Sequence, residues 1–365
     1  MRFLFLVLAG IMLVSNNAKG ADFTYALNLN NYYGYTDYSK PYNKIYKQNN
    51  LNSSANLYLN GSYDFSDDYK ISLISYFMVD SAKEVENYNQ GKWGEEIYSL
   101  LETPYGEITI GQASNVAYEF AVGAPNIGNY RVNNSDIVNF ITNPNWYKKG
   151  SKYSYKTLNS TYINTDGASI KANYMTPEYY GIKIGATYIP KVYSQSGLVA
   201  KNAEYKDNSA YVLGAYGYWD ILGYELETSL GFADYKDNDK EYSAGVSVYR
   251  KGWTVGASYR ETKAYNKYRI DKDDLFDAYR EGKAYNIGIS YAIGPITTGI
   301  SYFESKSEIA SNKNEIISFS NSYEYDKYTT ISFTASHLQA STNNKEIKEN
   351  SKGYAFILGL EIGLW

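Results

Sequence analysis

The chain has 365 residues, of which 44 are tyrosine, one is histidine and none is cysteine. Without cysteine there are no disulfides, thiolate-ligated metal centres or thiol nucleophiles. The 35 basic and 39 acidic side chains give a net charge of −4, which offers no basic surface for nucleic acid. After the first twenty residues no apolar run reaches the ~20 residues of a membrane helix. If this chain crosses a membrane, strands must cross it.

Residues 1–20 have the features of a secretory signal peptide. Arg2 precedes an uninterrupted apolar stretch over residues 3–14, and small residues suit cleavage between Gly20 and Ala21. A membrane anchor is the alternative, but twelve apolar residues are too few to span a bilayer. Cleavage would leave 33 basic and 39 acidic side chains, a net charge of −6. We expect an exported mature chain, residues 21–365, that forms one domain.

The mature chain alternates apolar and polar residues with a period of two. In residues 222–232, leucine, tyrosine, threonine and phenylalanine take every second position, while glycine, glutamate and serine fill the others. Such a segment turns one face toward lipid or a core and the other toward water. Sixteen segments have this pattern, at 23–32, 55–65, 69–79, 94–102, 106–113, 168–176, 180–189, 208–219, 222–233, 241–250, 252–261, 284–292, 295–304, 314–323, 327–338 and 353–364.

The connections between these segments favour a membrane barrel. Seven are tight and eight are long, in alternation, and all seven prolines lie outside a segment or at its end. The polar faces are rich in glycine, serine, threonine and asparagine, and aromatic residues end the apolar faces. A soluble β-sandwich would also alternate, but its outward face would be the polar one. We predict an all-β fold, a transmembrane antiparallel barrel of about 16 strands with short periplasmic turns, long extracellular loops and a water-filled lumen.

Two hairpins resemble those of the general porins of Gram-negative outer membranes. Residues 98–112, YSLLETPYGEITIGQ, are similar to the hairpin that leads into that family's constriction loop, and residues 172–188, ANYMTPEYYGIKIGATY, are similar to the next hairpin. With residues 251–259, KGWTVGASY, the resemblance extends over the whole mature chain. It implies a third long loop folded into the lumen, assembly as a homotrimer, and contact with membrane lipid and lipopolysaccharide. One departure is Gln112, where the family usually has an arginine on the basic wall of the pore.

The longest connection, residues 113–167, is the candidate for the loop inside the lumen. Between residues 116 and 146 it carries few charges, namely Glu119, Arg131 and Asp136. Water in the lumen can satisfy the backbone of such a loop. Its last stretch, residues 152–165, could instead extend the next strand.

The position of a residue in the alternation of its strand, which we call its phase, predicts whether its side chain faces the lumen or the lipid. We expect the loop's Glu119, Arg131 and Asp136 to form a constriction opposite Lys171 of the wall. The predicted pore-lining residues are Gln112, Lys183, Glu225, Glu227 and Arg260. On the same phases five acids face four bases, which are Asp64, Glu107, Glu225, Glu227 and Glu361 against Lys70, Lys171, Lys183 and Arg260. With the negative mature charge, this predicts a mild preference for cations.

No group of residues indicates catalysis or a resident cofactor. His337 is in phase with the lipid-facing Ile331 and Phe333, so we interpret it as a rim residue. Two acidic clusters in long loops could bind Ca²⁺, but neither has the spacing of a calcium loop, and solvated loops are the better interpretation. These clusters are Asp234, Asp237 and Asp239, and Asp271, Asp273, Asp274 and Asp277.

The sequence therefore predicts a porin, not an enzyme, with no cofactor and no metal. Ions and small hydrophilic solutes would pass by diffusion. Two alternatives remain open: a substrate-specific channel, which a solute would block, and a surface adhesion or structural barrel, which would not conduct.

Overall fold

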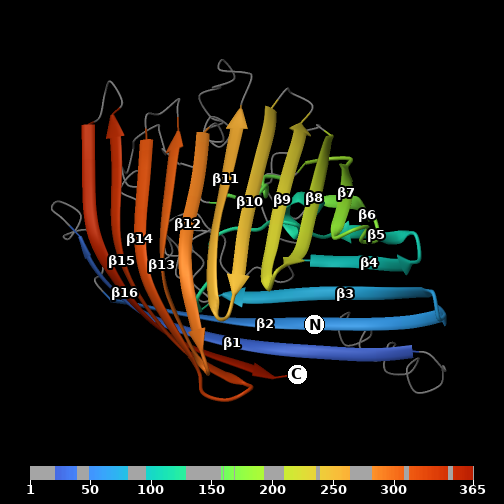
Figure 1. Cartoon of the computed structure of the whole chain (residues 1–365), viewed down its shortest axis with the longest axis horizontal. Helices are drawn as coiled ribbons and strands as arrows, with labels where there is room; N and C mark the ends of the chain where they lie inside the picture. The colour runs from blue at the N-terminus through green and yellow to red at the C-terminus, as the bar shows by residue number, and fades with distance from the viewer. Residues whose placement is uncertain are drawn as a thin grey trace.

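The computed structural model describes residues 21–38, 49–80, 96–128, 158, 160–167, 169–192, 209–235, 239–263, 282–307, 312–343 and 348–364. Its sixteen strands form one closed antiparallel barrel in which each strand pairs with its neighbours in sequence and β1 pairs with β16 (Figure 1). The strands are β1 (Ala21–Tyr38), β2 (Asn49–Ser66), β3 (Tyr69–Asp80), β4 (Glu96–Thr103), β5 (Gly106–Gln112), β6 (Ile170–Met175), β7 (Ile182–Ile189), β8 (Ala210–Ile221), β9 (Tyr224–Tyr235), β10 (Asp239–Arg250), β11 (Trp253–Lys263), β12 (Gly282–Ile293), β13 (Ile296–Ser307), β14 (Asn312–Glu324), β15 (Thr329–Asn343) and β16 (Lys348–Leu364). The predicted fold, a barrel of sixteen antiparallel strands, is confirmed.

The two faces of the wall differ as the alternation predicts. On β9, the outward Leu230 is 63% exposed, whereas the inward Ser229 beside it is 8% exposed. The same contrast separates Ile287 from Asn286 on β12. Because the outward face stays apolar all around a closed sheet, lipid rather than a second protein layer is its natural solvent. No helix among the described residues is long and apolar enough to cross a membrane.

The bounds of the strands at the loop rim correct one prediction. The seven predicted short turns are present and define the turn rim. At the opposite loop rim, three connections expected to be long are only three or four residues, at 236–238, 308–311 and 344–347. Backbone pairing continues there beyond the apolar band, because a strand can end in polar residues once it leaves the hydrocarbon. Asp234 and Asp239 therefore belong to β9 and β10 rather than to a loop.

The stretch before β6 also differs from one expectation. The described residues between 158 and 167 form turns and bends, and β6 begins only at Ile170. They do not extend the strand, because their side chains bond to the barrel wall instead.

Candidate functional site

The connection between β5 and β6 enters the barrel as a short helix, α2 (Val116–Glu119). Asn115 is the N-cap, and its side-chain oxygen accepts a hydrogen bond from the Tyr118 N–H at 2.9 Å. The first helical N–H, that of Val116, donates to the Thr187 hydroxyl of β7 at 3.0 Å. The wall thus supplies a hydrogen-bond acceptor for an N–H group that has no partner within the helix.

A row of glycines lets the loop lie flat against the inner wall. Each strand from β7 to β13 contributes one, and successive loop residues from Val116 to Ile127 contact them in order. The row is Gly185, Gly214, Gly231, Gly245, Gly256, Gly288 and Gly299. A side-chain carbon at Gly245 would lie 1.9 Å from the Val122 carbonyl oxygen, so only glycine permits this approach. The described loop therefore covers the inside of seven adjacent strands.

Backbone hydrogen bonds fix the loop along this row. The Val122 N–H donates to the Ser229 hydroxyl at 3.0 Å, and the Ala124 N–H donates to the Asn286 side-chain oxygen at 3.2 Å. All four groups are buried, so each bond removes a donor that would otherwise be unsatisfied.

The returning part of the loop is held by a buried ion pair. Asp166 and Lys171 of β6 are each 1% exposed, and their carboxylate and ammonium groups are in direct contact. Asn115 donates to the second Asp166 oxygen at 2.6 Å, and Lys171 also donates to the Gly167 carbonyl at 2.9 Å. This network ties the start of the loop to its end.

A second ion pair, between β10 and β11, anchors residues 164–165 of the returning loop. Arg260 of β11 is 2% exposed and donates to Glu241 of β10 at 2.8 Å. Its other bonds reach the loop, to the Asn164 side chain at 2.8 Å and the Thr165 hydroxyl at 2.7 Å. Two of the inward cations, Lys171 and Arg260, are therefore parts of the loop's support.

Apolar contacts also hold the returning loop against the inner wall. Ile163 is fully buried in a cluster with Val212 and Ala233, on the loop-rim half of β8 and β9. Leu158 packs with Phe303 and Ile357 further around the wall. These buried apolar contacts hold the returning loop against the inner wall.

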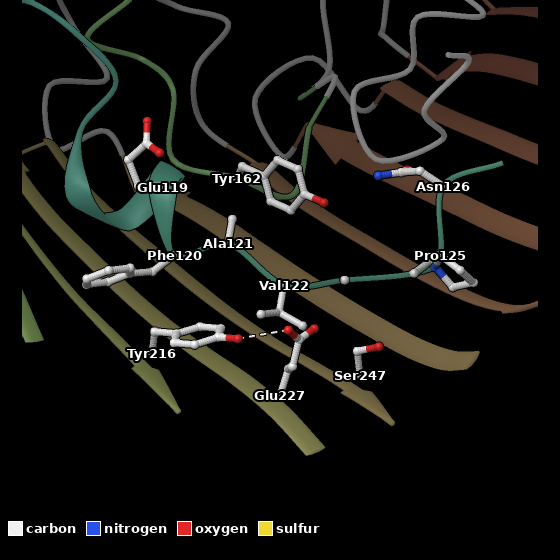
Figure 2. A pocket seen from close by; sticks show the side chains of 12 residues that line it. Glu119, Phe120, Ala121, Val122, Pro125, Asn126, Tyr162, Tyr216, Glu227 and Ser247 are labelled. Atoms are coloured by element: carbon white, nitrogen blue, oxygen red, sulfur yellow. Dashed lines mark hydrogen bonds between the residues drawn. The ribbon is translucent and has the colours of Figure 1, made fainter. Parts of the chain in front are cut away.

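The loop lines a cavity of about 440 Å³ (Figure 2). The segment Phe120–Asn126 separates Glu119 and Tyr162 on one side from Tyr216 and Glu227 on the other. Tyr216 donates to Glu227 at 2.8 Å, and its ring lies 6.2 Å from that of Phe120. Two carboxylates and three aromatic rings thus line the space where the loop narrows the lumen.

The carboxylate of Glu119 binds a proton more readily than an ordinary glutamate does. The surrounding barrel desolvates it, and the Glu96 carboxylate on β4 repels its charge, so its pKa lies above the ordinary value. Glu96 itself accepts a hydrogen bond from Ser114 at 2.8 Å. The two acids therefore lie close together at the entrance of the loop.

The inner wall carries more carboxylate than ammonium among the described residues. The five predicted inward acids keep their phase, and the register adds Glu96, Glu102, Asp220 and Glu241. Of the four predicted bases, Lys171 and Arg260 are in buried pairs, while Lys70 lies 3.9 Å from Glu102. Lys183 is half-buried on the inner face of β7.

The predicted site residues thus have different outcomes. Glu119 and Glu227 line the same cavity, and Lys183 and Glu225 are in inward phase on their strands. Arg131 and Asp136 lie outside the described residues.

Three predicted positions need correction. Gln112 pairs with the outward Ile97 and Ile170, so its phase is that of the lipid face. Lys171 and Arg260 do face inward, but the loop covers both, and neither meets open water as a pore charge. Lys171 therefore does not face open water opposite Glu119.

The remaining candidates for chemistry form no site as far as the structure describes them. His337 pairs with the outward Ile317 and Tyr354 and packs on the Tyr354 ring at 5.0 Å, as expected of a rim residue. Asp234 lies 3.9 Å from Lys240. The other members of the acidic clusters, apart from the strand residue Asp239, lie outside the described residues, and the described ones include no group of three that could hold a metal.

Sequence reasoning missed the residues that hold the loop. Asn115, Asp166 and Glu241 were not singled out, because nothing in their local sequence marks them as partners. The glycine row was detectable, since one glycine recurs on the polar face of each strand from β7 to β13.

A closed sixteen-stranded barrel with a polar, partly obstructed lumen defines an outer-membrane channel. The family model for Gram-negative porins matches residues 8–344, and the chain belongs to this family. Its fold and family thus indicate a channel rather than an enzyme. They also indicate that this channel lies in the outer membrane.

Solved outer-membrane proteins have the same fold at low sequence identity. A loop-deletion mutant of OmpT, an outer membrane protein of Vibrio cholerae, has a TM-score of 0.58 at 9% identity, with 95% of this chain and 100% of that chain covered. The anion-selective porin from Comamonas acidovorans has a TM-score of 0.54 at 12% identity, covering 94% and 100%. A mutant of the Rhodopseudomonas blastica porin has a TM-score of 0.53 at 9% identity, again covering 94% and 100%. The search of curated proteins found no match.

Proposed function

We propose that the protein is a cation-preferring porin through which ions and small hydrophilic solutes diffuse passively. The observation that carries the proposal is the distribution of charge inside the barrel. Carboxylates outnumber ammonium groups on the described inner wall, and the loop covers two of the four cations. Fixed charge of one sign raises the local concentration of counter-ions in a narrow pore, so cations pass more readily than anions.

Export and assembly complete the proposal. Residues 1–20 act as the signal peptide, and the mature chain, residues 21–365, inserts among outer-membrane lipid and lipopolysaccharide. The family resemblance supports a homotrimer. No bound cofactor is needed, because selectivity follows from the width and charge of the lumen.

The test is the reversal potential of the refolded mature protein in a planar bilayer under a KCl gradient. The unmodified channel should prefer K⁺. Neutralising the cavity in the variant Glu119→Gln/Glu227→Gln should move the reversal potential toward zero. Asp67→Asn/Asp68→Asn is the matched control, because it also removes two carboxylates and both residues are exposed in a turn between β2 and β3. Anion preference in the unmodified channel would contradict the charge argument.

A substrate-specific channel is the second candidate, and the cavity is the observation that favours it. Three aromatic side chains, Phe120, Tyr162 and Tyr216, would stack on a solute that the carboxylates attract. A solute that blocks K⁺ current at micromolar concentration would support this candidate. A protein that inserts but does not conduct would instead support an adhesion or structural barrel.

A further inference from the structure

The inner wall beside the cavity carries three tyrosines, which we call the tyrosine track. Tyr216 lines the cavity, Tyr218 occupies the next inward position of β8 toward the turn rim, and Tyr249 lies on β10. Tyr249 shares the inner face because it pairs in register with the inward Glu225 of β9. The first two residues are half-buried and Tyr249 is 41% exposed. The track therefore offers aromatic surface to a solute in the lumen.

Two glutamates of β9 lie between the strands that carry the track. Glu227 is opposite Tyr218 in register and accepts a hydrogen bond from the Tyr216 hydroxyl at 2.8 Å (Figure 2). Glu225 is opposite Tyr249 on one side. Each carboxylate thus has a phenol ring directly across the ladder. A cation held by either carboxylate would also lie against an aromatic ring, which attracts it further.

The wall places two of these negative charges against each other. Asp220 of β8 and Glu225 of β9 are paired in register on the inner face, next to the turn that joins the two strands. Like charges that are directly opposite destabilise a sheet. A cation bound at this end of the track would relieve the repulsion.

A single positive charge lies at the other side of the track. Lys183 of β7 is half-buried, faces inward and is opposite Tyr216 in register. It is the one cation among the described inward residues on the turn-rim half of β7–β10. Two strand spacings of ~4.8 Å and two residues of ~3.4 Å separate its Cα atom from that of Glu227 by roughly 12 Å. Both side chains are long, so a small solute with charges of both signs would bridge the remaining gap.

A second tyrosine–glutamate pair on the inner wall lacks the accessible ring. Tyr32 of β1 donates to Glu361 of β16 at 3.2 Å, but Tyr32 is only 6% exposed. This pair therefore presents a carboxylate without an aromatic surface, and it serves as a natural comparison for the track.

We propose that the tyrosine track binds a small solute that carries a guanidinium group and a carboxylate, as arginine does. A guanidinium is planar, stacks on aromatic rings and pairs with carboxylates through two parallel hydrogen bonds, whereas an ammonium is a strongly hydrated point charge. Glu225 and Glu227 hold the guanidinium against the rings, and Lys183 pairs with the carboxylate of the solute. The inference rests on the proposed channel function, because it names the solute of the second candidate.

The test is isothermal titration of arginine into the mature protein in nonionic detergent. The unmodified protein should bind arginine in the micromolar range. Glu227→Gln should weaken binding about tenfold, since a hydrogen bond to a charged group is lost. Tyr218→Leu should weaken it about threefold through the lost ring. The matched control Glu361→Gln also removes an inward carboxylate that accepts a bond from tyrosine, and it should bind arginine as the unmodified protein does. Urea titration checks that each variant is folded.

Three related solutes separate the two halves of the site. Norleucine lacks the guanidinium and propylguanidinium lacks the carboxylate, so both should bind more weakly than arginine, and lysine should also bind more weakly. Lys183→Gln should weaken the binding of arginine and leave that of propylguanidinium unchanged. Absence of arginine binding, an equal loss in Glu361→Gln, norleucine binding as tight as that of arginine, or an equal effect of Lys183→Gln on both guanidinium solutes would overturn the proposal.

A planar-bilayer recording distinguishes this proposal from the channel itself. Arginine should block K⁺ current over the same concentration range in which it binds, and norleucine should not block there. Binding of arginine by a protein that does not conduct would refute the channel and leave the solute site standing. Conduction without arginine binding would refute the solute site and leave the channel standing.

Discussion

The buried pair of Asp166 and Lys171 gives the most direct test of how the loop is held. The variant Lys171→Met keeps the length of the side chain and removes its charge. Because both groups are 1% exposed, the Asp166 carboxylate would be left in a buried site without its cation. Removing one partner of such a pair costs about 3 to 5 kcal/mol. Release of the loop from the wall would relieve this cost, because it would expose the carboxylate to water in the lumen.

Two measurements detect this release. Single-channel recordings of Lys171→Met should have a larger conductance and more open-channel noise, because the loop no longer narrows the lumen in one fixed position. Urea titration of the folded barrel should show that the sheet itself survives, since the strands keep their pairing. The loss of a wall cation alone would change selectivity without adding noise.

The matched control is the double variant Lys171→Met/Asp166→Asn. It removes both charges, and the new side-chain amide can still accept the hydrogen bond from Asn115, so the buried site holds no lone charge. Replacing both members of a buried pair is often close to neutral. The single-channel conductance and the open-channel noise should therefore return to the values of the unmodified protein. Lys171→Met channels with normal noise and conductance, or a double variant as noisy as the single one, would refute this account of the anchor.

Three further predictions concern the wall and the cavity. Gly245→Ala should displace the loop and raise conductance, since its new carbon would lie 1.9 Å from the Val122 carbonyl oxygen, whereas Gly294→Asn in an open turn should conduct normally. Leu230→Arg should destabilise the inserted barrel by about 2 to 4 kcal/mol in urea titrations, while the inward change Glu225→Gln should leave stability intact; equal stability would contradict the assigned phase. Because the pKa of Glu119 is raised, its carboxylate gains a proton at a higher pH than an ordinary glutamate. Cation preference should thus decline early on acidification, and Glu119→Gln should remove this step from the pH dependence of the reversal potential.

Strand phase and the number of strands follow from the sequence because they depend on neighbouring residues. In β9 every second residue contacts lipid, so the alternation of Leu226, Thr228 and Leu230 with Glu225 and Glu227 specifies both faces without knowledge of the rest of the chain. The same local rule assigns His337 correctly to the outer face. It fails at the loop rim, where polar residues continue the backbone ladder and carry no hydrophobic signal.

The path of the inner loop depends on residues that are far apart in the chain. Val122 bonds to a residue 107 positions away and Ala124 to one 162 positions away, so no local pattern specifies these contacts. Phase correctly predicts that Lys171 and Arg260 point inward, but it cannot predict that Asp166 and the returning loop cover them. The sequence by itself determines which face of the wall each side chain occupies. Only the tertiary structure decides which inward charges meet water, because that depends on where a loop tied by long-range hydrogen bonds lies against the closed wall.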